Sequence, residues 1–149
     1  MKPSQTSQTS ISSLNFPIEK LPGLSAEDCQ KLKDHGIQTT RSLIKKAGFK
    51  RSEKEAFAIA IGVRLQLLTK WLAFADLARI PAVGLQHCGI IVHSGIVSLE
   101  QLSQTPLDKL HKQILRLQVQ QFRRADLCPD IAEMAIWVKQ AQQLLRSSV

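Results

Sequence analysis

The sequence has no tyrosine and only 5% aromatic residues, although 44% of its 149 residues are hydrophobic. A core made of Leu, Ile, Val and Ala favours helices packed on helices over a β-sandwich, which depends more on aromatic and β-branched residues. The apolar runs, such as AFAIAIGV, are also far shorter than the roughly 20 residues of a membrane-spanning helix. These shortages together predict an all-α fold without a transmembrane segment.

The cysteines are few, and their spacing indicates no pairing. Cys29, Cys88 and Cys128 form an odd set without a CxxC motif, and the N-terminus lacks the apolar segment of a signal peptide. We therefore expect free thiols and a cytoplasmic location. The Ser-, Thr- and Gln-rich residues 1–15 predict a disordered leader, and residues 16–149 predict a single compact domain.

The charge balance is strongly positive. Lys and Arg outnumber Asp and Glu, which gives a formal net charge of +8 at pH 7. A surplus of this size favours polyanionic partners, namely nucleic acid, an acidic protein surface or an anionic membrane. The alternative is an ordinary basic surface that is exposed only to solvent. The charge therefore favours anionic partners but does not indicate which of them binds.

An internal repeat organises the chain. Residues 18–43 align without gaps on residues 77–102, at a constant offset of 59 (77 minus 18). Identical residues recur at turn, core and cap positions: Pro22 with Pro81, Cys29 with Cys88, Gly36 with Gly95, Ile37 with Ile96 and Leu43 with Leu102. The alignment predicts two pseudo-repeats, at about 18–76 and 77–146.

Each copy has the signals of two helices joined by a short turn. A helix at about 25–34 or 84–93 is expected to end at Gly36 or Gly95, and Thr39 or Ser98 then caps a second, shorter helix. Further helices are expected from a capping box at Ser52–Glu55, over 64–77, after Thr105-Pro106, and over 131–145. The last of these helices should turn Met134, Trp137, Val138, Ala141 and Leu145 inward.

The pattern of a hydrophobic–Pro–Gly turn, a helix, Gly–Ile–x–Thr/Ser and a second helix resembles the helix-hairpin-helix motif. The order of elements over residues 18–145, including Lys70-Trp71-Leu72 and Ala75-Asp76-Leu77, resembles the tandem helix-hairpin-helix proteins catalogued as domain of unknown function 4332. The resemblance implies an all-α fold of two tandem helix-hairpin-helix (SAM-like) units with additional packed helices. It implies little about function, because none is established for the family.

The hairpin turns are candidate phosphate sites. In DNA-binding proteins with this motif, a Gly–hydrophobic–Gly turn lets backbone N–H groups approach a phosphate at a helix N-terminus. Here Ser25 replaces the second glycine of the first turn, and Ala82 replaces the first glycine of the second turn. Candidate contacts at the second turn are Arg79, Ala82, Val83, Gly84 and His87, and weaker candidates at the first are Gly23, Leu24 and Ser25. The alternative is that both turns are structural corners.

A stronger basic signal follows the second copy, since residues 109–125 contain no Asp or Glu. On a continuous helix the basic residues would lie within about 60° of one another, opposite an apolar side that includes Val119. The basic residues concerned are Lys109, Lys112, Arg116 and Arg123, followed by Arg124. We expect either a docking surface for phosphates or acidic protein, or a face exposed only to solvent. A second cluster, at 41–54, is diluted by Glu53 and Glu55.

The sequence contains no recognisable catalytic motif. It lacks a phosphate-binding loop, a GxSxG turn and an HExxH pair, and His87 and His93 would point about 120° apart on a helix. We therefore predict no catalytic residue, metal or cofactor. The favoured hypothesis is a binding module that docks onto a partner protein or complex through a basic or apolar helical surface. The alternative is a protein that contacts nucleic-acid phosphates through the second hairpin and the helix at 109–124, and peripheral membrane contact is a third possibility.

Overall fold

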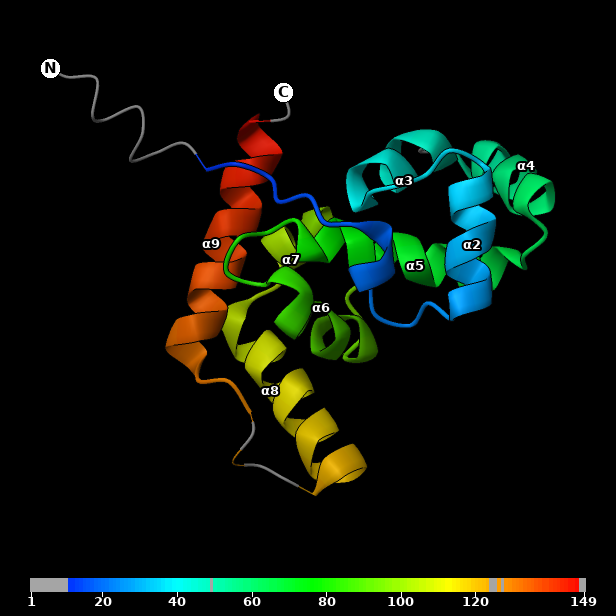
Figure 1. Cartoon of the computed structure of the whole chain (residues 1–149). Coiled ribbons are helices and arrows are strands. Elements are labelled where there is room, and N and C mark those ends of the chain that lie inside the picture. The colour runs from blue at the N-terminus through cyan, green and yellow to red at the C-terminus, as the bar shows by residue number, and fades with distance from the viewer. Residues whose placement is uncertain (1–10, 49, 124–125, 127, 148–149) are drawn as a thin grey trace, which may run out of the picture. The chain divides into compact units, whose positions relative to one another are not determined.

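The computed structural model describes residues 11–48, 50–123, 126 and 128–147 (Figure 1). These residues form helices joined by turns, and among them no β-strand is present apart from an isolated antiparallel bridge between Pro17 and Thr39. The predicted all-α fold is confirmed. Residues 1–10 of the predicted leader lie outside the described part, whereas Leu14 donates its backbone N–H to the carbonyl oxygen of Arg79 at 2.8 Å.

The chain divides into two compact units. One consists of Asn15–Asp76, and the other consists of Leu77–Val149 together with the first fourteen residues. The division falls between Asp76 and Leu77, where the two predicted pseudo-repeats meet. Each unit is described by itself below.

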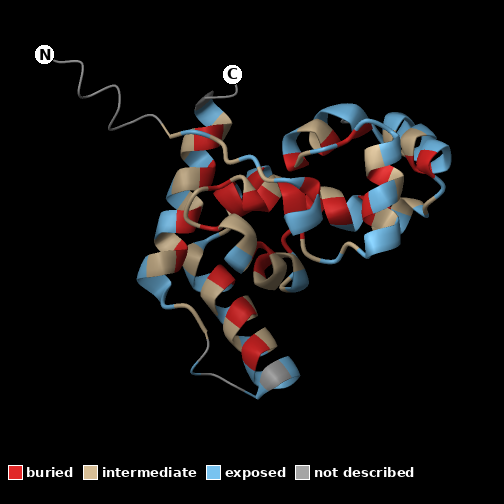
Figure 2. Cartoon of the chain, in the orientation of Figure 1, coloured by how far each residue is buried: buried red, intermediate tan, exposed pale blue. Residues whose placement is uncertain are grey.

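The unit Asn15–Asp76 has a largely aliphatic core. Its elements are the 3₁₀ helix η1 (Ile18–Lys20) and the helices α2 (Ala26–Asp34), α3 (Thr40–Ala47), α4 (Arg51–Ile61) and α5 (Leu65–Ala78), the last two residues of which belong to the other unit. Trp71 is fully buried in this core, and Phe74 is almost completely buried. Leu32 of α2, Leu43 of α3 and Leu68 of α5 are also fully buried, and Figure 2 shows buried positions on all three helices.

The second unit is built around its C-terminal helix. Its elements are α6 (Gly84–His93), α7 (Leu99–Gln104), α8 (Leu107–Leu117), the π-helix η2 (Gln118–Phe122) and α9 (Ile131–Ser147). Helix α9 packs along α7 and α8, as Figure 1 shows. Trp137 of α9 is fully buried, together with Leu102 of α7 and with Leu110 and Ile114 of α8.

Helix α2 ends as the sequence predicts, at a glycine with left-handed backbone. Gly36 has φ +83°, a conformation that costs a residue with a side chain about 1 kcal/mol or more. It donates its N–H to the carbonyl of Lys33 at 3.0 Å, and Ile37 donates to Leu32, also at 3.0 Å. This is the Schellman pattern, in which the buried Ile37 fixes the direction of the chain after the helix.

The second unit repeats this arrangement at the equivalent positions. Gly95 has φ +111°, and Ile96 donates its N–H to the carbonyl oxygen of Ile91 at 3.3 Å. The next helices have matching caps, because the hydroxyls of Thr39 and Ser98 accept the N–H of the residue three positions on. The stop glycines and the caps predicted from the repeat are therefore confirmed in both copies.

The predicted capping box at Ser52–Glu55 is wrong. Helix α4 begins one residue before Ser52, at Arg51, and its N-cap is Lys50. Glu53 is therefore the third helical residue, whose side chain accepts the N-cap N–H in a capping box. Its carboxylate accepts the backbone N–H of Lys50 at 3.0 Å. Glu55 instead accepts a hydrogen bond from the Arg51 side chain at 3.0 Å. The spacing of the motif is right, but its register is shifted by two residues.

The start of α8 also differs from the sequence prediction, in which Thr105 is the N-cap and Pro106 the first helical residue. Pro106 is the N-cap itself, whereas Thr105 closes the preceding helix α7. The Thr105 hydroxyl donates a hydrogen bond to the carbonyl oxygen of Gln101 at 2.7 Å, so it is turned back towards α7. Because Pro106 has extended backbone, with ψ 140°, the chain changes direction between the two helices.

Candidate functional site

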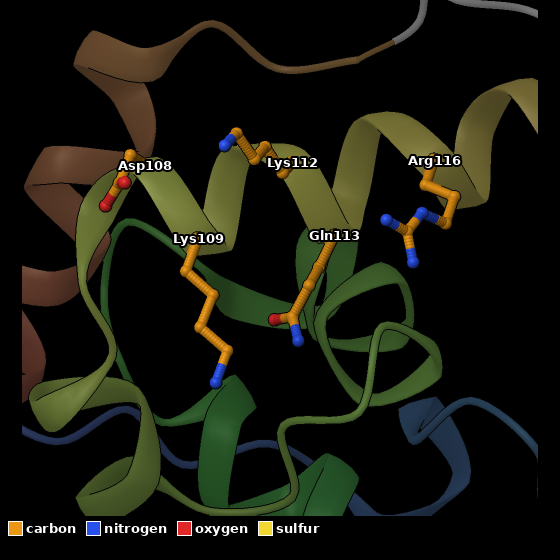
Figure 3. Close-up of a pocket in the computed structure, with 5 residues that line it drawn as sticks. All are labelled: Asp108, Lys109, Lys112, Gln113 and Arg116. Carbon is orange, nitrogen blue, oxygen red and sulfur yellow. The ribbon is translucent and has the colours of Figure 1, made fainter.

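The candidate site is the outer face of α8. Lys109, Lys112 and Arg116 are exposed on successive turns of this helix, while Leu110 and Ile114 are buried on its other side. An open depression of about 330 Å³ is lined by Asp108, Lys109, Lys112, Gln113 and Arg116 (Figure 3). The amphipathic pattern predicted from the sequence is confirmed over this part of the helix.

These three cations make no ion pair within the part of the chain that the structure describes. Lys109 and Lys112 are three residues apart, and Lys112 and Arg116 are four apart, so like charges are neighbours along the helix surface. Lys109 also lies in the first turn of α8, where the helix dipole disfavours a cation. Each of these placements is slightly unfavourable for folding.

The predicted continuous helix over 109–124 is wrong beyond Leu117. Helix α8 gives way there to the π-helix η2, and the chain leaves η2 at Arg123, which has a left-handed φ of 54°. A π-turn contains an additional residue per hydrogen-bonded ring, so it shifts the helical faces that follow. Arg123 therefore does not continue the regular stripe, and Arg124 lies outside the described residues.

The prediction of which side chains point inward is also wrong next to this junction. Val119 was expected on the apolar side but is 47% exposed, and Gln118 is buried instead. Because Val119 follows Arg116 by three residues, it lies at the C-terminal end of the basic face. We call Lys109, Lys112, Arg116 and Val119 the α8 face.

At the second hairpin turn, the backbone N–H groups are already used inside the unit. The N–H of Ala82 donates to Oε1 of Gln140, on α9, at 2.7 Å. The N–H groups of Val83 and Gly84 both donate to the carbonyl oxygen of Ile80 at 2.9 Å. A phosphate at this turn would have to displace Gln140 and compete with the turn's own hydrogen bonds.

A carboxylate also reaches this turn from α9. His87 Nε2 lies 3.1 Å from Oε2 of Glu133, and the His87 ring lies 5.1 Å from the ring of Trp137. The sequence near the turn contains no acidic residue, so only the packing of α9 reveals Glu133 as a neighbour. Its negative charge opposes a phosphate next to His87. Arg79, the remaining candidate here, accepts the N–H of Leu14 through its carbonyl oxygen.

The first hairpin turn has a structural explanation as well. Ser25 is the N-cap of α2, and its hydroxyl accepts the N–H of Asp28 at 3.0 Å. Gly23 has φ +83°, and a Cβ there would lie 3.1 Å from the Phe74 ring. Both the backbone conformation and the close approach of α5 therefore require glycine. Glu27 and Asp28 occupy the first turn of α2. Their negative charges interact favourably with the helix dipole there and repel an anion.

The basic cluster of the first unit differs from the α8 face. Arg51 pairs with Glu55, and Glu53 holds the start of α4. Lys45 and Lys46 lie in the last turn of α3, where a positive charge interacts favourably with the helix dipole. Local interactions therefore account for much of this cluster.

The cysteines are poorly suited to chemistry. Cys29 and Cys88 are buried free thiols at equivalent positions of the two copies, and Cys128 is half-buried. Burial raises the pKa of Cys88 to about 11, and burial also raises the pKa of Cys128. Both thiols are thus protonated near neutral pH. A nucleophile or a metal ligand has to be the deprotonated thiolate. No group of three or more His, Cys, Asp or Glu side chains among the described residues is placed to hold a metal ion.

No single described helix is long and apolar enough to cross a membrane. Helices α4 and α5 together reach the required length and composition, but they meet at a bend of 110°. The prediction that the chain has no transmembrane segment agrees with this finding.

Comparison with known proteins identifies a family and nothing more specific. No curated protein and no solved structure matches the chain. One family model, described as "Domain of unknown function (DUF4332)", matches residues 22–144, which include most of the first copy of the repeat and all of the second. The chain therefore belongs to the DUF4332 family.

Proposed function

We propose that this chain is a small helical binding module, not an enzyme, and that it docks onto a partner protein or complex through the α8 face. The observation that carries the proposal is the run of exposed cations at Lys109, Lys112 and Arg116, none of which has an ion-pair partner among the described residues. A surface that places like charges side by side, one of them against the helix dipole, is explained by an anionic ligand better than by folding.

The scaffold of this module is proposed to be two tandem helix-hairpin-helix units. Three features support this assignment: the constant offset of 59 (77 minus 18), the glycine-ended helices α2 and α6, and the hydroxyl caps of α3 and α7. In this scheme the hairpins provide rigidity, and the binding surface lies on a helix outside them.

Nucleic acid is the alternative ligand, because the same cations would attract phosphates. Two features of the second hairpin favour a protein partner instead. The Ala82 N–H, which a hairpin of this type would offer to a phosphate, is bonded to Gln140, and Glu133 adds a negative charge beside His87. A duplex would therefore contact α8 without the backbone contacts that fix its position.

A pull-down from native lysate with the purified full-length chain tests this function. The test variant is Lys112→Glu/Arg116→Glu, and the control is Lys45→Glu/Lys139→Glu, which changes the net charge equally at exposed positions elsewhere. We expect a defined protein set to be retained by the wild type and the control, to be lost with the test variant, and to survive nuclease treatment. Recovery of nucleic acid alone, or equal retention by both variants, contradicts the proposal.

A further inference from the structure

Val119 adds an apolar end to the basic face. Its side chain is 47% exposed in the π-helix η2, three residues after Arg116. Single exposed hydrophobic residues are common on protein surfaces and need no explanation by themselves. Val119 differs because it directly continues, on the same side of the helix, a row of three cations that have no ion-pair partner among the described residues.

The spacing of the α8 face is that of one helix side. From Lys109 the face continues three residues to Lys112, four to Arg116 and three to Val119. At 1.5 Å per residue these steps are about 4.5, 6 and 4.5 Å, so the whole face is about 15 Å long. A second helix lying along α8 presents its own side chains at the same steps, because its residues three and four apart also share one side.

We infer that the α8 face binds an acidic amphipathic helix of a partner protein, with carboxylates opposite the three cations and an apolar residue against Val119. This inference rests on the proposed function and specifies the partner's chemistry. Charge complementarity selects the carboxylates, and burial of the exposed Val119 selects the apolar residue. A duplex offers phosphates to the three cations but no aliphatic side chain for Val119, so Val119 distinguishes the two ligands.

The probe is a synthetic helical peptide with Glu at the spacing of the three cations and Leu at the spacing of Val119. Two versions place the Leu before or after the Glu residues, one for each direction of docking. Binding to the full-length chain is measured by fluorescence anisotropy, with a labelled duplex DNA in parallel. We expect Val119→Ser to weaken binding of the preferred peptide roughly fivefold and to leave duplex binding unchanged. Val97→Ser is the matched control, since Val97 is 52% exposed elsewhere in the same unit.

Replacing the peptide's Leu by Ser makes the same test without altering the protein. It should weaken binding to the wild type by a similar factor and have little further effect on the Val119→Ser variant. Equal affinity of the Leu and Ser peptides, or tighter binding of the duplex than of either peptide, overturns the inference. If Lys112→Glu/Arg116→Glu still fails to retain protein from lysate in that case, the docking function stands and only the chemistry of the partner is wrong.

Discussion

The backbone N–H of Ala82 donates a hydrogen bond to Oε1 of Gln140 at 2.7 Å, joining the second hairpin turn to α9 across 58 positions of sequence. The contact occupies a group that the hairpin motif otherwise leaves available to a phosphate. This hydrogen bond, together with the Glu133 carboxylate next to His87, leaves the turn poorly suited to bind a phosphate. The exposed charge of α8 begins 27 residues further along the chain (109 minus 82), and it makes no ion pair within the described residues.

Gln140→Ala should destabilise the protein, because it leaves the half-buried N–H of Ala82 without its acceptor. We expect the free energy of unfolding to fall by about 1 kcal/mol, as measured by urea denaturation. Gln86→Ala is the control, since Gln86 is exposed in the same unit. An equal effect of the two substitutions would show that the Gln140 contact does not contribute to stability.

Replacing either of two glycines of α6 with alanine should change the stability of the protein, in opposite directions at the two positions. Gly95 ends α6 with φ +111°, so Gly95→Ala should cost about 1 kcal/mol or more. Gly89 lies inside α6, and a Cβ there would meet nothing within 4 Å, so Gly89→Ala should stabilise by roughly 0.5–1 kcal/mol. Thermal unfolding followed by circular dichroism measures both. A loss of stability in Gly89→Ala would mean that the space around this position is needed.

The protein should lose stability between about pH 9 and pH 11 through Cys88. The pKa of this thiol is raised from 9.0 to about 11 by burial in the folded state, so the unfolded chain releases its proton first as the pH rises. The stabilising effect is fully present below pH 9 and is lost as the pH approaches 11. Urea midpoints measured across this range should fall more steeply for the wild type than for Cys88→Ala. Parallel pH profiles of the two proteins would refute this assignment.

Lys109→Glu should raise stability while weakening partner binding. The substitution removes a cation from the first turn of α8 and places a carboxylate three residues before Lys112. Both changes are favourable in the isolated chain, and we expect a gain of about 0.5 kcal/mol in the free energy of unfolding. Lys139→Glu, in the middle of α9, should give no such gain. If Lys109→Glu instead lowers stability, the cation has a structural role and the basis of the α8 docking site is weakened.

Local signals in the sequence identified the parts of the fold that depend on neighbouring residues. Gly36 and Gly95 end their helices as expected, and Thr39 and Ser98 cap the helices that follow, because each device acts within one turn of backbone. The misplaced capping box of α4 shows the limit of this approach, since two acidic residues two positions apart compete for one role.

The candidate site was predicted only in part, for a related reason. Helical spacing correctly placed Lys109, Lys112 and Arg116 together, but it gave no indication that the helix becomes a π-helix after Leu117. Val119 could have been assigned to the basic face from the sequence, because at 100° per residue it lies about 60° from Arg116 and about 180° from Leu110. The closure of the second turn was also missed, because Gln140 comes from a helix that is distant in sequence.

The two buried tryptophans provide a means to observe each half of the molecule separately. Trp71 lies fully buried in the unit Asn15–Asp76 and Trp137 in the other unit, and the sequence contains only these two indoles. Replacing either one with Phe leaves a single fluorophore whose emission shifts to longer wavelength when its own unit admits water. Coincident transitions of the two single-tryptophan proteins would show that the halves unfold as one cooperative body, and separate transitions would show two independently melting halves.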